Sequence, residues 1–170
     1  GAIAEKIENR PLNQLMQERI FRPLGMQDSG FANAGDYVIN RALPYKGKGS
    51  NASVQKVALV GDPPSGAGGQ YSSVGDLHKF CQSILFDNKL LDDDSKGLLF
   101  NHDLPTSWEE IKRSGKIFGF VGGDTGGWSA KITFMFTPSS IYCVVIVANF
   151  DNMAHELDLK LREVLKRDYK

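Results

Sequence analysis

Residues 131–148, KITFMFTPSSIYCVVIVA, carry the most regular pattern in the chain. Lys131, Thr133 and Met135 alternate with apolar residues over 131–136, the two-residue period of a β-strand. Pro-Ser-Ser at 138–140 favours a turn. Residues 141–148 are rich in β-branched residues and lack polar alternation, which is typical of a central strand. The stretch therefore predicts a β-hairpin within an antiparallel sheet.

Helical patterns flank this hairpin. One amphipathic stretch follows Pro11, a residue that suits the first turn of a helix. A second begins at a Ser73-x-x-Asp76 capping pattern, and a third has Asp151 or Asn152 as its expected N-cap. We expect an α+β fold in which helices flank the antiparallel sheet. The expected single partial domain comprises a helical entry (1–30), an irregular substrate-side region (31–72), a helical region (73–115), the sheet (116–150) and a C-terminal helix (151–170).

Composition and charge exclude several classes of protein. The 170 residues carry 20 Lys plus Arg and 20 Asp plus Glu, so a nucleic-acid partner is not expected. No apolar run reaches the ~18 residues of a membrane span. Cys81 and Cys143 lie far apart and are expected to be buried free thiols. No metal-ligand spacing occurs, and we expect no metal and no cofactor.

Serine, lysine and histidine residues give weak catalytic signals. Ser53 and Lys56 match S-x-x-K, in which a lysine one helical turn away takes the serine proton. The flanking residues are polar and glycine-rich, so no helix is expected there and the match is attributed to chance. His78, His102 and His155 are scattered along the chain. Their spacing matches neither a hydrolase triad nor a zinc site.

Two glycine-rich segments, 66–73 and 122–127, run directly into a helix and a strand. Neither has the lysine of a phosphate-binding loop. Glycine permits positive φ angles and close approach of the backbone. Residues 122–127 could therefore let a substrate lie against the strand or could simply form a tight turn, and both interpretations stay open.

Three segments together resemble the serine β-lactamase-like family, which includes class C β-lactamases, D-alanyl-D-alanine carboxypeptidases and related esterases. The first is IFRPLGMQDSGF at 20–31, and the second is PSGAGGQYSS at 64–73, followed by Asp76, Leu77 and Phe80. The third runs from 122 to 129 and continues as strand, turn and strand to Ala148-Asn149. The resemblance implies a β-lactamase/transpeptidase-like fold that is incomplete at the N-terminus.

The resemblance also implies where the active site should lie. The family uses a Ser and a Lys one turn later, a Tyr-x-Asn loop, and a Lys/His-Thr/Ser-Gly motif on an edge strand that binds substrate. The first two elements normally precede the helix at the start of this sequence, so no catalytic residue is expected in the chain. The basic residue of the third element falls on Phe120 or Val121. The expected substrate-binding residues are Phe120, Val121, Gly122, Gly123 and Asp124.

Two functions follow from this resemblance. The chain is either the C-terminal portion of a serine hydrolase that cleaves an ester, amide or β-lactam by an acyl-enzyme route, or a catalytically inactive relative that serves as a ligand-binding or sensory domain. A fold unrelated to hydrolases is the third possibility. The expected partners are a small-molecule or peptidoglycan-like substrate and a second copy bound through the exposed sheet or the missing-half surface. Many relatives are exported, which makes a periplasmic or extracellular location plausible, and no signal peptide is visible in the chain.

Overall fold

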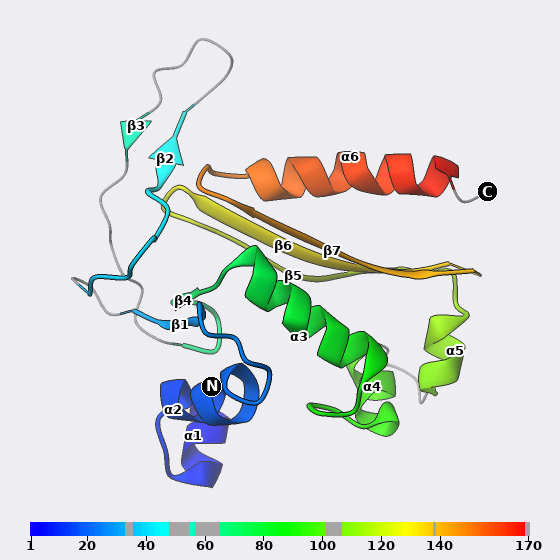
Figure 1. Cartoon of the computed structure of the whole chain (residues 1–170), viewed down its shortest axis with the longest axis horizontal. Coiled ribbons are helices and arrows are strands. Elements are labelled where there is room, and N and C mark those ends of the chain that lie inside the picture. The colour runs from blue at the N-terminus through cyan, green and yellow to red at the C-terminus, as the bar shows by residue number, and fades with distance from the viewer. Residues whose placement is uncertain (33–35, 48–54, 57–64, 101–106, 138, 169–170) are drawn as a thin grey trace.

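The computed structural model describes residues 1–32, 36–47, 55–56, 65–100, 107–137 and 139–168 (Figure 1). Short helices and two-residue strands occupy the N-terminal half, and the long elements follow. The helices are α1 (Ala2–Glu8), α2 (Leu12–Met16), the π-helix η1 (Gln17–Phe21), α3 (Val74–Phe86), α4 (Asp93–Phe100), α5 (Trp108–Lys112) and α6 (Met153–Asp168). The strands are β1 (Gly30–Phe31), β2 (Tyr45–Lys46), β3 (Gln55–Lys56), β4 (Gln70–Tyr71), β5 (Ile117–Thr125), β6 (Trp128–Phe136) and β7 (Ile141–Ala148).

An antiparallel three-stranded sheet of order β5-β6-β7 forms the centre of the molecule. α6 covers one face of this sheet, and α3 lies on the other face near α4 and α5 (Figure 1). The predicted α+β architecture and the hairpin at 131–148 are confirmed. The prediction of β7 as a central strand differs from the structure, because β6 is central in the described sheet and β7 lies at its edge.

The hydrophobic core lies between β6 and the helices α3, α4 and α5. Ile132, Phe134 and Phe136 point from β6 into this core and are buried there. The ring of Phe100 meets Phe134 and Phe136 edge-on, with centroids 5.2 and 5.5 Å apart, a favourable aromatic geometry. Thr133 and Met135, on the opposite face of β6, are also buried. The alternation at 131–136 therefore distinguishes two buried faces of β6, and not a solvent-exposed face from a buried one.

Cys81 and Cys143 form a disulfide that joins α3 to β7, with the two Cα atoms 6.3 Å apart. The prediction of two free thiols is therefore wrong. The two cysteines are 62 residues apart in the sequence. Packing of α3 against β7 brings them together, and no local pattern could signal that contact.

α6 is attached to the other face of the sheet by polar contacts. The hydroxyl oxygen of Ser129 accepts the Ala154 N–H at 3.0 Å in the first turn of the helix. Further along α6, Arg162 forms an ion pair with the buried Asp158 and donates to Thr133 Oγ1 at 2.9 Å. Asp151, one of the two expected N-caps, accepts the Gly127 N–H at 2.7 Å. A serine from the neighbouring strand thus caps the helix, and Asp151 fixes the β5–β6 turn.

Candidate functional site

The five predicted substrate-binding residues lie consecutively on β5, an edge strand of the described sheet. Phe120 and Val121 contribute backbone to the strand, whose register shifts between Gly119 and Val121 as in a β-bulge. Bulges re-aim strands at the edges of sheets and beside active sites. The structure therefore places the predicted residues together, and their binding of substrate stays a prediction.

Gly122 and Gly123 present different environments on the two faces of β5. Gly123 pairs with Ala130 on β6. Ala130 lies two residues before the core residue Ile132, so Ala130 and Gly123 lie on the face of the sheet that α3 covers. A Cβ atom on Gly123 would meet none of the described atoms within 4 Å. A Cβ atom on Gly122 would lie 2.9 Å from the side chain of Lys131 on the opposite face. Both glycines are exposed, but an added atom has free room at Gly123, whereas the Lys131 side chain occupies that space at Gly122.

Asp124 has a structural contact at the end of β5. Its Oδ1 atom accepts the Asn152 N–H at 2.7 Å, just before α6 begins. It pairs with Ser129, which places it on the α6 face of the sheet and opposite the open face at Gly123. Asp124 thus joins the strand to the C-terminal helix.

The segment 41–46 packs against the β5–β6 turn and the end of β7. Trp128 Nε1 donates to the Ala42 carbonyl at 2.9 Å, and Asn149 Nδ2 donates to the Leu43 carbonyl at 3.0 Å. Gly127 has φ of 94°, and a Cβ atom there would lie 2.7 Å from Tyr45 N. The glycine at 127 is therefore required by a tight turn and by close approach of the chain's own backbone. These contacts connect part of the irregular region to the predicted site, and no local sequence pattern signals them.

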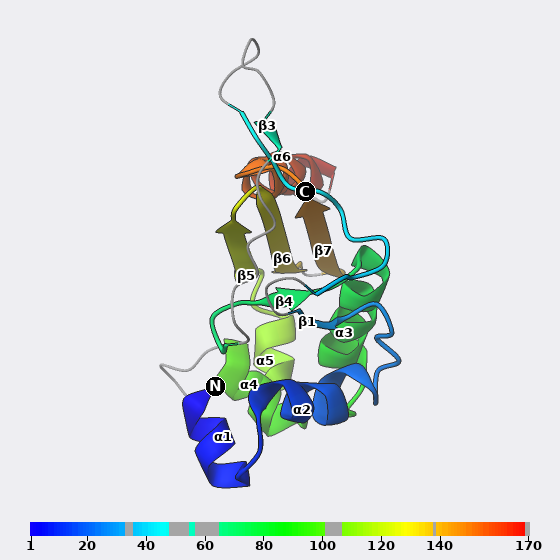
Figure 2. The ribbon, with the colours of Figure 1, turned by 90° about the vertical axis from the view of Figure 1, so that its left-hand side faces the viewer.

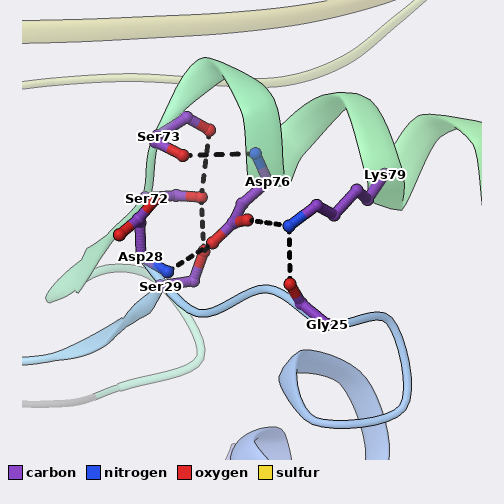
Figure 3. A network of polar contacts seen from close by, with 7 residues as sticks. All are labelled: Gly25, Asp28, Ser29, Ser72, Ser73, Asp76 and Lys79. Atoms are coloured by element: carbon purple, nitrogen blue, oxygen red, sulfur yellow. Dashed lines mark hydrogen bonds and ion pairs between the residues drawn. The ribbon is translucent and has the colours of Figure 1, made fainter.

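A buried carboxylate, Asp76, connects two of the sequence segments that carry the family resemblance (Figure 3). Its Oδ2 atom accepts the Asp28 N–H at 2.7 Å and the Ser29 hydroxyl at 2.8 Å. Its Oδ1 atom accepts from Lys79 at 2.8 Å, and the same ammonium donates to the Gly25 carbonyl at 2.6 Å. The Asp76 network, Gly25, Asp28, Ser29, Ser72, Ser73, Asp76 and Lys79, therefore fixes the segment after η1 against the first turns of α3.

The charge of Asp76 is stabilised by its hydrogen bonds. Burial raises the pKa of Asp76, but hydrogen bonds from Lys79, Ser29 and the Asp28 N–H together lower it by more than burial raises it. The pKa of Asp76 therefore lies below its ordinary value. Ser73 completes the predicted cap, because its hydroxyl oxygen accepts the Asp76 N–H at 3.2 Å. The Ser-x-x-Asp pattern is thus confirmed as a helix start, while its carboxylate contacts a distant loop.

Two grooves lie near the N-terminal helices. A polar groove of about 370 Å³ separates α2 and η1 from β1 and β4. An apolar groove of about 330 Å³ lies between α1 and the following helices. The polar groove is lined by Asn13, Gln14, Gln17, Glu18, Arg22, Ser29, Gly30, Phe31 and Tyr71. Neither groove contains the predicted residues of β5.

The weaker sequence candidates form no catalytic cluster in the described chain. Ser53 and His102 lie outside the described residues, and Lys56 lies in the strand β3. His78 and His155 are exposed. Within the described ranges no group of three or more His, Cys, Asp or Glu residues could hold a metal ion. None of the described helices is both long enough and apolar enough to cross a membrane.

Comparison with known proteins identifies the family. The family model described as Beta-lactamase matches residues 1–167. The chain belongs to the beta-lactamase family. A curated member of similar sequence is the D-alanyl-D-alanine-carboxypeptidase/endopeptidase AmpH of Escherichia coli K12, which is 33% identical over 76 residues. That match covers 45% of this chain and 18% of AmpH.

Solved structures share the fold of this beta-lactamase-family chain. A penicillin-binding protein from Bacillus halodurans superimposes with a TM-score of 0.74 at 17% identity, over 96% of this chain and 53% of that protein. The octameric penicillin-binding protein homologue from Pyrococcus abyssi gives 0.65 at 21% identity, over 95% and 40%. Simvastatin synthase (LovD) from Aspergillus terreus gives 0.60 at 20% identity, over 89% and 46%. The chain thus spans about half the length of these structures.

Proposed function

We propose that this chain supplies the substrate-binding edge strand of a serine hydrolase that cleaves an ester, amide or β-lactam through an acyl-enzyme. The nucleophilic serine and its lysine would come from sequence outside these 170 residues. The observation that carries the proposal is the β5 edge, open at Gly123, in a chain of the beta-lactamase family. AmpH, whose name describes a D-alanyl-D-alanine carboxypeptidase, makes a peptide-like substrate one candidate.

An open edge strand suits this role for physical reasons. The outer edge of β5 offers backbone N–H and C=O groups that can pair with an extended, peptide-like substrate. N–H donors fixed in a strand can also stabilise the oxyanion that develops during acyl transfer. Glycine at 123 lets the substrate approach the backbone closely. The 41–46 segment, attached through Trp128 and Asn149, would form a neighbouring wall.

The described serines of the Asp76 network fit a structural role and not a nucleophilic one. Ser29 and Ser72 hydroxyl oxygens lie 2.7 Å apart, and Ser29 donates to Asp76. A carboxylate with a lowered pKa is a weak general base, because a base works best with a pKa near the operating pH. Lys79 is occupied by Asp76 and the Gly25 carbonyl. Catalysis would therefore require a serine from elsewhere.

A fluorescent penicillin and a fluorophosphonate, applied to the protein encoded by the complete gene, test the proposal. We expect a covalent adduct on a serine of S-x-x-K type outside residues 1–170, located by peptide mass spectrometry. Gly123→Val should slow acylation by on the order of tenfold or more, because a displaced substrate reacts poorly. Gly75→Val, at an exposed position in the first turn of α3, is the matched control and should leave the rate unchanged. Failure of both probes to label any serine would refute the proposal.

A catalytically inactive, ligand-binding relative is the second candidate. Its motivation is the identity of residues 120 and 121, where Phe and Val replace the Lys or His expected from the family resemblance. Without a basic group, the strand has less attraction for a substrate carboxylate. This candidate predicts that calorimetry with the peptide acyl-D-alanyl-D-alanine detects reversible binding while mass spectrometry detects no adduct. An adduct that turns over would exclude it.

A further inference from the structure

The side chain of Lys131 lies across the backbone of the neighbouring strand β5. Lys131 is in β6, where it pairs with Gly122 and shares a face of the sheet with Ser129 and Thr133, the residues that contact α6. Its Cδ atom lies 2.9 Å and its Nζ atom 3.3 Å from the position of a Cβ atom on Gly122. Figure 2 shows β5 as the outermost strand on one side of the sheet, with α6 above the sheet. The missing side chain at 122 therefore leaves room for a lysine to carry its charge to the edge of the sheet.

The Lys131 ammonium has no partner within the described part of the chain. It is half-buried, and it neither donates a hydrogen bond nor forms an ion pair with another described residue. The other described lysines that are at least partly buried are both paired: Lys96 donates to the Asp87 carbonyl at 2.7 Å, and Lys112 forms an ion pair with Glu109. Partial removal of a cation from water without a counter-charge is unfavourable. The position of Lys131 therefore favours an anion from outside the described residues.

The carboxylates nearest in the fold already have other partners. Asp124 is the one acidic residue of β5, and its Oδ1 atom accepts the Asn152 N–H at 2.7 Å. Asp158, on the side of α6 that faces the sheet, is buried and forms an ion pair with Arg162. The nine residues of β5 include no basic residue. Lys131 thus supplies from β6 the positive charge that β5 itself lacks.

We propose that Lys131 binds a carboxylate of a substrate that lies along the outer edge of β5. This inference rests on the proposed function, because it takes β5 as the strand that pairs with the substrate. The backbone of β5 then binds the peptide groups of the substrate, while the ammonium that extends over Gly122 binds its acid. Of the ester, amide and β-lactam substrates considered above, those with a free carboxylate are therefore preferred over neutral ones.

A lysine suits this position for physical reasons. An ammonium has three donors on a flexible stem, so it can follow a carboxylate over a short distance without a change in the backbone. The charge comes from the neighbouring strand, so residues 120 and 121 can be Phe and Val without loss of attraction for an acid. Because Gly122 is exposed, the resulting ion pair would be open to solvent, and added salt should weaken it.

Two acyl-D-alanyl-D-alanine peptides, one with a free C-terminal carboxylate and one with a C-terminal amide, test the proposal in the protein encoded by the complete gene. The preference for the acid is the ratio of the two kcat/KM values, or of the two association constants if the peptides bind without cleavage. We expect Lys131→Met to lower this preference by about tenfold or more, through weaker recognition of the acid alone. Lys131→Arg should keep most of the preference. Lys160→Met, at an exposed position of α6, is the matched control and should leave it unchanged.

Gly122→Ala supplies a second variant, in which the charge is kept but displaced. Its Cβ atom would lie 2.9 Å from Lys131 Cδ, so the lysine side chain must move and the preference should fall severalfold. A wild type that treats acid and amide alike, or an unchanged preference in Lys131→Met, would overturn this inference and leave the proposed function standing. Fluorophosphonate labelling of the wild type reports the proposed function separately, because that probe has no carboxylate. Failure of the wild type both to take the label and to bind either peptide would overturn the two proposals together.

Discussion

Replacement of Asp76 by asparagine isolates the contribution of one buried carboxylate. Asp76 is 1% exposed and accepts hydrogen bonds from Asp28 N–H, Ser29 and Lys79 at 2.7–2.8 Å. The Asp76→Asn variant keeps the shape, but its amide nitrogen cannot accept a hydrogen bond and would face either Lys79 or the pair of donors. Charge-assisted hydrogen bonds contribute about 1.5–3 kcal/mol. Lys79 is 44% exposed, so solvent screening reduces its share.

We therefore expect Asp76→Asn to lower the free energy of unfolding by about 2–3 kcal/mol, with the loss of one charge-assisted bond and weakening of two others. For a chain of this length that corresponds to a fall in Tm of about 4–12 °C. Urea unfolding followed by circular dichroism measures the difference. Asp28→Asn is the matched control, because it removes the exposed carboxylate of Asp28 and leaves in place its N–H, the group that donates to Asp76.

The stabilising effect of Asp76 should decrease at acidic pH. The pKa of Asp76 is lowered in the folded protein relative to its ordinary value of 3.8. Its stabilising contribution is therefore fully present above pH 3.8 and is lost as the pH falls through the lower folded pKa. The difference in unfolding free energy between wild type and Asp76→Asn should shrink over that acidic range. Equal stabilities of Asp76→Asn and Asp28→Asn at neutral pH would refute the proposed role of the network.

Three further perturbations test other contacts. Because Cys81 and Cys143 form a disulfide, we expect no titratable thiol in denatured, unreduced protein, and recovery of two free thiols would contradict the bond. The double variant Cys81→Ser, Cys143→Ser should lower the free energy of unfolding by about 2–4 kcal/mol. Gly127→Ala should lower the free energy of unfolding, measured with urea, by about 2 kcal/mol or more, because φ is positive and the new Cβ atom meets Tyr45 N. Gly68→Ala is the control and should have little effect, because no described atom lies within 4 Å of its added Cβ. Similar losses in both variants would count against the close approach at Gly127. Trp128→Phe removes the hydrogen bond to the Ala42 carbonyl and should increase the rate of proteolytic cleavage within 41–46 severalfold without changing global stability. An unchanged cleavage rate would show that Trp128 does not hold this segment.

The sequence alone predicted those parts of the fold that depend on local periodicity. The alternation at 131–136 and the β-branched run at 141–148 correctly indicated the hairpin, and Ser73 correctly marked the start of α3. A periodic pattern reports which face of an element is buried, but it does not name the element that buries it. For that reason β7 was expected in the centre of the sheet and Cys81 was expected to be unpaired.

Prediction of the candidate site reached the strand but not its surroundings. The family resemblance located residues 120–124, and the structure places them along one edge strand. The contacts that shape the region join residues far apart in sequence, such as Trp128 with Ala42 and Asp76 with Asp28. Such pairings depend on the relative positions of whole elements. The sequence feature that goes with the Asp76 contact is the presence of polar residues in both resembling segments.

The Asp76 network also fixes the two ends of a long connection. Residues 28–29 and 72–76 are held together by this network, and the adjacent β1 pairs with β4. The chain between β1 and β4 therefore leaves and re-enters the molecule at one place. Loop closure costs only about 0.6 kcal/mol for each doubling of loop length. Insertions and deletions in the parts of this connection outside the attached 41–46 segment should therefore cost the core little stability.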